Sequence, residues 1–362
     1  MFSSARLSLA RNRRGLTKKE VAEACDVSRR TVSGWESGEF SPSEGAVEQL
    51  VRLLDFPKEF FYGKDLEELA AESASFRALT AISARQVHRV TSSATLACEV
   101  SDWITQRFVT PPVNIPDLSD LHPEDAAQTL RGHWNLGDRP LGNLIHIVEA
   151  HGARVFSLPG DVIEVDAFSL WRDGTPHVFL NTIKSVEHGR FDVAHELGHL
   201  VLHKGIVTAR AKEFEQEAHA FASAFLMPAA SVYARINGFV DINTILKLKS
   251  HWNVSAMALT HRLHRLQLLS DWSYRSIIVE LTRLGYRKGE PGGLHDRESS
   301  KLLAKVFASL RAKGITKAKF ARELALRERE LDSLIFGLVL LPVTGGGEAA
   351  SRRSEAQLRV VV

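Results

Sequence analysis

A pentapeptide in the second half of the chain combines three side chains that can carry out hydrolytic chemistry. It reads His195-Glu196-Leu197-Gly198-His199. Residues four apart share one face of a helix, so His195 and His199 can present two imidazoles to one zinc ion. Glu196 lies beside them and can accept a proton from a zinc-bound water. Apolar residues occupy most flanking positions, so we expect a buried helix, in which these groups are costly unless they are paired or bind a metal.

A third protein ligand is expected on the next helical segment, residues 213–228, which reads EFEQEAHAFASAFLMP. Glu215 lies next to the apolar face of this segment. Its carboxylate would complete a His/His/Glu site with one position open for water, the pattern of catalytic zinc sites. Glu213 and Glu217 are expected to face solvent. His219 could lie behind the ligands, donate to a transition state, or act as an alternative ligand.

His203 follows His199 by four residues and lies on about the same face. It could be a fourth ligand or a group that contacts the ligands. The simpler interpretation is a histidine at the C-terminus of the helix, where the helix dipole favours a cation.

A second set of residues predicts two short helices near the N-terminus. Thr17 is a good helix N-cap, and Glu20 three residues later completes a capping box. Residues 26–27 are expected to form the turn to a second helix over residues 28–36.

The second of these helices would present its first side chains to the major groove of DNA. The candidate DNA-contacting residues are Lys18, Ser28, Arg29, Arg30 and Ser33. Arginine can donate two hydrogen bonds to guanine or contact phosphate. The first 30 residues carry eight basic groups against three acidic ones, which favours an anionic partner.

Residues 16–38 recur without gaps as residues 315–337, and the apolar positions of the two segments coincide. Both copies therefore predict two helices joined by a tight turn. In the second copy the helix equivalent to the DNA-contacting one carries Arg327, Glu328, Arg329, Glu330 and Asp332, and its acidic groups would repel phosphate. We interpret the second copy as a packing or partner-binding module.

Composition and chain breakers predict several domains in a mainly helical chain. The 362 residues suffice for two or three domains of about 100 to 200 residues each. Short β-type runs occur only in the part that carries the histidines, at residues 155–156 and 178–180. A proline-rich run and a glycine-rich run suggest further boundaries. The expected parts are a helix-turn-helix domain (1–64), a helical connector with a proline-rich linker (65–117), the histidine-bearing domain (118–290), a C-terminal helical module (291–343) and a disordered tail (344–362).

Neither a membrane helix nor a secretion signal is expected. The longest apolar run near the C-terminus has nine residues, whereas a membrane helix needs about 20. Arginines interrupt the N-terminal segment, which lacks the apolar centre of a signal peptide. The two cysteines, Cys25 and Cys98, lie far apart and fit a reducing cytoplasm.

The string LTKKEVAEACDVSRRTVSGWESGEFSPS resembles the helix-turn-helix of the Cro/phage-repressor (XRE) class, over about residues 5–62. Lys18 stands where the family often has Gln, and Asp26 where Gly is common in the turn. The resemblance implies a five-helix repressor-type domain that binds a double-stranded DNA operator. Because such operators are two-fold symmetric, it also implies a homodimer.

The strings RFDVAHELGHLVLH and E..A..FA..FLMP resemble the ImmA/IrrE family of zinc metallo-endopeptidases, over about residues 125–235. The resemblance implies an α+β zincin-like domain with zinc on His195, His199 and Glu215 and with Glu196 as general base. His219 stands where the family often has Asp or Asn. Family members cleave Cro-class repressors in stress or mobile-element switches. Some carry a helix-turn-helix and a C-terminal helical segment, and residues 66–110, with SFRAL at 75–79, resemble their connecting region.

These observations predict a cytoplasmic DNA-binding transcriptional regulator with a zinc-dependent endopeptidase domain whose substrate is a repressor-type protein. One alternative is a regulator whose protease-like domain is a non-catalytic sensor or dimerisation platform. Another is an antitoxin-like repressor.

Overall fold

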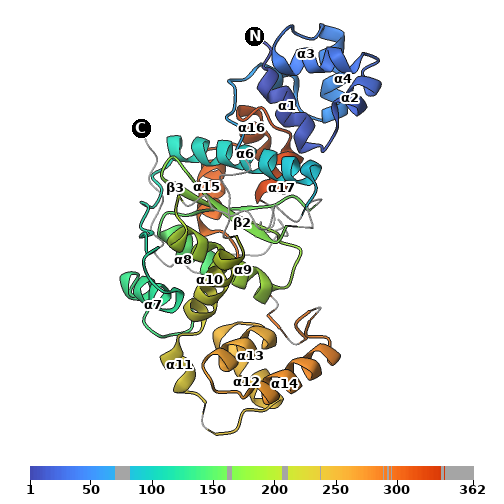
Figure 1. Ribbon diagram of the computed structural model, residues 1–362. Helices are drawn as coiled ribbons and strands as arrows, with labels where there is room; N and C mark the ends of the chain where they lie inside the picture. The colour runs from blue at the N-terminus through green and yellow to red at the C-terminus, as the bar shows by residue number, and fades with distance from the viewer. Residues whose placement is uncertain are drawn as a thin grey trace, which may run out of the picture.

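The structure is a computed structural model in which helices surround one small sheet (Figure 1), and the mainly helical fold class is confirmed. It describes residues 1–69, 82–160, 165–205, 211–236, 238–287, 289–291, 293–294, 296–335 and 338. The connector motif at residues 75–79 and the tail at residues 344–362 lie outside the described residues.

The N-terminal end of the molecule is a bundle of short helices, called the head here (residues 1–63). Its elements are α1 (Ser4–Arg13), α2 (Lys18–Ala24), α3 (Arg29–Ser37), α4 (Glu44–Leu54) and the 3-10 helix η1 (Lys58–Tyr62). The five expected helices are therefore four α-helices and one 3-10 helix. Figure 1 shows α3 at the outer end of the molecule, on the side of the head remote from the sheet.

Local hydrogen bonds set the ends of α2 and α3 as the sequence predicts. Thr17 and Glu20 form the reciprocal capping box at the start of α2. Asp26 adopts a left-handed φ of 51°, which forms the tight turn between the two helices. Ser28 caps α3 by accepting a hydrogen bond from the backbone N–H of Thr31.

One long helix, α6 (Ala84–Arg107), connects the head to the rest of the molecule. Ser83 and Gln86 form a capping box at its start. Helix was expected over all of residues 65–110, but residues 64–69 are not helical. Residues 109–118 contain neither helix nor strand, as the proline-rich run predicts.

The sheet has the strand order β1-β3-β2, with β1 parallel and β2 antiparallel to β3. Its strands are β1 (Arg154–Ser157), β2 (Ala167–Arg172) and β3 (Thr175–Leu180). The two expected β-type runs lie in β1 and β3. Asp173 and Gly174, with φ values of 49° and 72°, form the two-residue turn from β2 to β3.

Side chains along the strands alternate between two hydrophobic cores, because successive residues of a strand point to opposite faces. The side chains in the core shared with α6 and the head are Phe156, Phe168, Leu170 and Phe179. The side chains in the core on the other face are Val155, Ala167, Val178 and Leu180. The sheet is thus the layer between the head side and the helices that carry the histidines.

Helices on the second face position the candidate site. They are α7 (Pro123–His133), α8 (Leu144–Ala150), α9 (Val186–Leu202), α10 (Ala211–Leu226), α11 (Ala229–Tyr233), α12 (Ile242–Trp252), α13 (Ala256–Arg265) and α14 (Asp271–Arg283). α9 and α10 cross closely at Gly198, where an added Cβ would lie 3.2 Å from Cα of Ala218 and 3.1 Å from Cδ1 of Phe221. The absence of a side chain at Gly198 therefore lets the two helices approach.

The C-terminal module consists of α15 (Lys301–Ala312), α16 (Lys317–Glu323) and α17 (Glu328–Ile335). α16 and α17 repeat the two helices and the tight turn of α2 and α3, as predicted from the sequence, and α15 precedes them as α1 precedes α2. Gly314, with φ 67°, corresponds to Gly15, with φ 63°, before the second helix. Ala325 has the same left-handed φ of 51° as Asp26 before the third helix.

Candidate metal centre

The pentapeptide lies in the second half of α9, which packs against β2 on one side and α10 on the other. Glu196 and His199 are buried, as the apolar flanks predict. The polar side chains therefore sit inside the protein, where each must find a partner.

Three side chains from α9 and α10 converge on one point. Nε2 of His195 and Nε2 of His199 are 3.1 Å apart. Each of these nitrogens is 3.5 Å from a carboxylate oxygen of Glu215. All three ligand atoms lie within 4.8 Å of one another. The three residues named from the sequence thus occupy one cluster.

This cluster fits a zinc ion by its dimensions and by its donor chemistry. Zinc binds imidazole nitrogen at about 2.0–2.1 Å, so two nitrogens at the tetrahedral angle lie roughly 3.3 Å apart. The 3.1 Å and 3.5 Å separations bracket this value. Two imidazoles and one carboxylate are also the donors of one class of catalytic zinc sites.

Electrostatic interactions within the cluster lower the pKa of Glu215 and raise the pKa of His195. Burial alone would raise the pKa of Glu215, but hydrogen bonds from His195 and His199 lower that pKa well below its ordinary value. Burial alone would lower the pKa of His195, but the carboxylates of Glu215, Glu196 and Asp192 raise it. The cluster therefore keeps Glu215 ionised, which is the form that binds a cation.

Behind His199 lies a short chain of hydrogen bonds, called the relay here (His199, His203 and Glu217). Nδ1 of His199 and Nδ1 of His203 are 2.9 Å apart, and Nε2 of His203 is 2.8 Å from Oε2 of Glu217. One tautomer assignment satisfies both contacts: His199 donates from Nδ1, and His203 donates from Nε2 to the carboxylate. In this assignment the ring proton of His199 is on Nδ1, so Nε2 would offer its lone pair to a metal ion instead of donating a hydrogen bond to Glu215.

The relay adds to two expectations from the sequence. His203 is the C-cap residue of α9, as the simpler interpretation had it, but it also contacts His199. Glu217 is half-exposed to solvent, and its carboxylate also accepts a hydrogen bond from His203, which the sequence did not predict.

A hydrogen bond from a strand of the sheet fixes the carboxylate of Glu196. Oγ of Ser169, on β2, donates a hydrogen bond of 2.7 Å to Oε2 of Glu196. Sequence reasoning missed Ser169. The signal was a single hydroxyl in the apolar strand AFSLW, on the face opposite Phe168 and Leu170.

An open groove adjoins the cluster and is lined by Glu215, Gln216, His219 and Arg265. The ring centroids of His195 and His219 are 4.9 Å apart. His219 therefore lies beside the three converging ligands and not among them. Arg265, from α13, was not singled out from the sequence.

The head places three of its candidate DNA-contacting residues, Ser28, Arg29 and Arg30, in solvent. Arg29 and Arg30 are exposed at the start of α3, and in the described part of the chain neither forms an ion pair. Ser28 is the N-cap of α3, and Ser33 is half-buried on the same helix. Lys18 lies 3.2 Å from a carboxylate oxygen of Glu36.

Other basic residues among the first 30 form ion pairs with carboxylates of the same chain. Arg11 pairs with Glu36, and Arg13 and Arg14 both pair with Glu330 of the C-terminal module. The charge run in the sequence thus overstates the positive charge that is free to meet an anion.

Two segments of the chain match known families. Residues 148–264 match the IrrE N-terminal-like domain. Residues 4–59 match a helix-turn-helix domain. The two resemblances seen in the sequence are confirmed. No curated protein matches the chain in a sequence search.

The IrrE N-terminal-like segment contains the sheet, α9 and α10, and hence the three converging ligands, Glu196 and Ser169. The helix-turn-helix segment contains α1 to α4 and supports DNA binding. Among the described residues, no helix combines the length and the apolar composition needed to cross a membrane.

Proposed function

We propose that the chain is a sequence-specific DNA-binding transcriptional regulator that carries a zinc-dependent endopeptidase. Its substrate is a repressor-type protein, cleaved in a stress or mobile-element switch in the cytoplasm. The observation that carries the proposal is the convergence of His195, His199 and Glu215 in a helix pair that also buries Glu196 beside them.

The peptidase part of the proposal gives each residue a task. His195, His199 and Glu215 would hold a zinc ion, which supplies Lewis acidity to a bound water and to the scissile carbonyl. Glu196 accepts the proton of the attacking water and returns it to the leaving amine. Ser169 orients the carboxylate of Glu196. The groove beside Glu215 and His219 admits the substrate chain.

The DNA-binding part of the proposal rests on the head. The helix α3 lies at the outer end of the molecule (Figure 1), and its residues Arg29 and Arg30 are exposed. α3 would enter the major groove, and a homodimer would read a palindromic operator.

Metal content tests the site first. Purified wild-type protein is expected to hold about one zinc ion per chain, and His199→Ala is expected to hold little. His251→Ala, a histidine of α12, is the matched control and is expected to keep the zinc. A wild-type protein that folds and binds DNA without zinc would favour the non-catalytic sensor instead.

Glu196→Gln separates metal binding from chemistry. This variant is expected to keep its zinc and to lose cleavage of repressor-type proteins encoded near the gene. Cleavage that persists in Glu196→Gln would remove Glu196 from the mechanism. Zinc binding without cleavage in the wild type would leave the sensor or the antitoxin-like repressor as the function.

A further inference from the structure

The C-terminal module repeats the order of α1 to α3 and their turns, but its third helix lies inward. α17 is the counterpart of α3, the helix expected to read DNA, because the turns before the two helices have the same left-handed φ. α3 points to solvent, whereas α17 lies between the head and the sheet (Figure 1).

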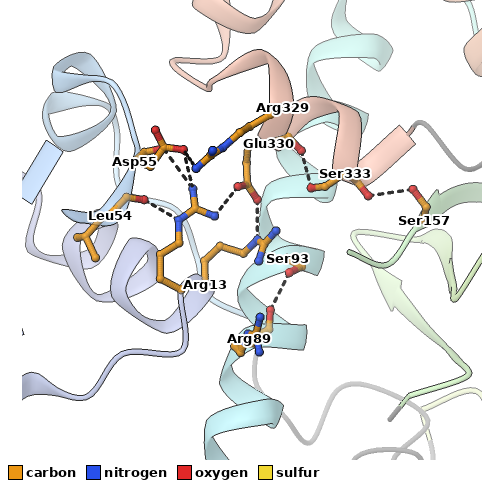
Figure 2. Close-up of polar contacts among 10 residues, drawn as sticks. Arg13, Leu54, Asp55, Arg89, Ser93, Ser157, Arg329, Glu330 and Ser333 are labelled. Carbon is orange, nitrogen blue, oxygen red and sulfur yellow. Dashed lines mark hydrogen bonds and ion pairs between the residues drawn. The ribbon is translucent and has the colours of Figure 1, made fainter. Parts of the chain in front are cut away.

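Glu330 of α17 contacts the head through a nearly buried ion pair (Figure 2). Its Oε1 accepts a hydrogen bond of 2.5 Å from Nε of Arg13, and its Oε2 accepts one of 2.7 Å from Nη1 of Arg14. The side chains of Glu330 and Arg13 are only 2% and 5% exposed. Both arginines belong to the basic run of the head.

A second ion pair lies next to the first, and in this one the head supplies the acid and α17 supplies the base. Arg329 pairs with Asp55 at the end of α4, and Nε of Arg327 lies 3.7 Å from the same carboxylate. Charges on α17 and on the head therefore alternate in complementary order. Such an arrangement fixes one docking position and opposes others.

The same helix also contacts the sheet. Oγ of Ser157, on β1, donates a hydrogen bond of 3.0 Å to the carbonyl oxygen of Ser333 (Figure 2). On α16, a carboxylate oxygen of Glu323 accepts a hydrogen bond from Nε1 of Trp103 on α6. Buried apolar residues of the head, α6, the sheet and the C-terminal module form one continuous core.

The side chain that forms the buried pair is an acid where α3 has a neutral residue. The positions of Arg29, Arg30 and Thr31 in α3 carry Glu328, Arg329 and Glu330 in α17. The carboxylate of Glu330 would repel phosphate, but it pairs with two arginines. Because a half-broken buried pair leaves an unpaired charge, the contact resists partial opening.

We propose that the C-terminal module is an intramolecular docking module: α17 binds the edge of the head formed by Arg13, Arg14 and Asp55 and ties it to the sheet. The module thereby holds the head in one orientation relative to the groove beside His219. In the proposed function, this orientation would place the groove against protein bound at the operator, and that consequence rests on the proposed function. The docking of α17 on the head does not depend on the proposed function.

Distances between the head and the body test this proposal in the full chain. Spin labels at Glu48→Cys on α4 and Gln128→Cys on α7 occupy exposed sites, and both native cysteines are buried. Double electron–electron resonance is expected to give one narrow distance distribution. Glu330→Gln is expected to broaden this distribution. Glu328→Gln, the same change at an exposed site on α17, is expected to leave the distribution narrow.

Two further samples keep the outcome interpretable. The double variant Arg13→Leu/Glu330→Leu replaces the buried pair by apolar groups and is expected to restore the narrow distribution. Unchanged far-ultraviolet circular dichroism shows that Glu330→Gln is folded. A distribution in Glu330→Gln as narrow as in wild type, or broadening that Glu328→Gln shares, would overturn the proposal.

Mixing the labelled chain with excess unlabelled chain shows whether α17 docks on its own chain or on a second copy. The doubly labelled wild-type chain, refolded or co-expressed with excess unlabelled chain, is expected to keep its distance because docking occurs within one chain. Loss of the distance on dilution would show that α17 docks on a second copy, which contradicts the intramolecular proposal. Neither readout depends on zinc or on cleavage, so a failure of the proposed peptidase would not affect it.

Discussion

In the part of the chain that the structure describes, Glu217 is linked to His199 through His203, which makes Glu217 a test of the relay. Glu217→Gln keeps the shape of the side chain and removes the charge that accepts the hydrogen bond of His203. Partners of this kind change metal affinity by about 10- to 100-fold, and we expect a loss near tenfold. Competition with a chromophoric chelator measures it. Glu213→Gln, an exposed carboxylate one turn earlier on α10, is the control and should leave the affinity unchanged.

His203→Gln and the cobalt-substituted protein check the same relay in another way. The visible spectrum of bound cobalt reports the ligand geometry, so a displaced His199 would change it. Wild-type affinity and an unchanged spectrum in both Glu217→Gln and His203→Gln would show that the relay does not support the ligand.

Ser169 contacts Glu196, which in the proposed mechanism moves a proton and does not hold the metal, so removal of this hydroxyl should affect turnover alone. Ser169→Ala leaves a buried carboxylate without its hydroxyl donor. A hydrogen bond to a charged group contributes about 1.5–3 kcal/mol, which corresponds to a fall in kcat/KM of roughly 10- to 100-fold. Zinc content should stay at the wild-type level, and Ser169→Thr should recover most of the activity. A Ser169→Ala enzyme with wild-type kcat/KM would separate this hydroxyl from the reaction.

At the scale of elements, the close crossing of α9 and α10 brings Glu215 to the two histidines. Gly198→Val inserts a branched side chain where even a Cβ meets Ala218 and Phe221 at 3.1–3.3 Å. Overpacking of this kind costs about 1–3 kcal/mol of unfolding free energy, and we expect zinc affinity to fall with it. Gly189→Ala, on the same helix with open space around its Cβ, should be neutral or slightly stabilising. Chemical denaturation and chelator competition measure both effects, and equal behaviour of the two variants would contradict the crossing argument.

The docking of α17 should make the free energy of unfolding depend on pH, because the contact includes the carboxylate of Glu330. Burial alone would raise the pKa of Glu330, but Arg13 and Arg14 lower that pKa below its ordinary value of 4.5. An acid with a depressed pKa in the folded protein stabilises it above the ordinary pKa, and this stabilisation is lost as the pH falls below 4.5. The difference in unfolding free energy between wild type and Glu330→Gln should therefore be largest near pH 7 and shrink in acid. Urea denaturation at several pH values measures it, and a difference that grows in acid would refute the assignment.

Local sequence patterns predicted those parts of the site that lie within one helix or on one helical face. His195 and His199 are one turn apart, so helical geometry alone brings them together, and the apolar face of α10 pointed to Glu215. Ser169 and Glu217 were not predicted as contacts, because strand register and helix crossing bring them to their partners. Glu330 was expected to deter phosphate, and its burial against Arg13 depends on contacts between residues far apart in the chain.

At the scale of the whole molecule, the sheet separates the two activities proposed for the chain. Its one face continues into α6 and the head, and its other face supports α9 and α10. The helix α3 and the helices α9 and α10, which carry the three converging ligands, thus lie on opposite sides of the sheet (Figure 1). A change at α3 should consequently alter DNA binding without altering the metal site.

The double variant Arg29→Ala/Arg30→Ala tests this separation. If both arginines contact phosphate, operator affinity falls and the slope of log K against log salt decreases in magnitude by roughly 2. If they contact base edges, each substitution costs about 1–3 kcal/mol of discrimination, and the slope changes little. Fluorescence anisotropy with operator and scrambled DNA at several salt concentrations distinguishes the two cases. Arg275→Ala/Arg283→Ala, two exposed arginines of α14, is the charge-matched control. Zinc content should be at the wild-type level in both variants, and wild-type DNA affinity in Arg29→Ala/Arg30→Ala would exclude α3 as the DNA-reading helix.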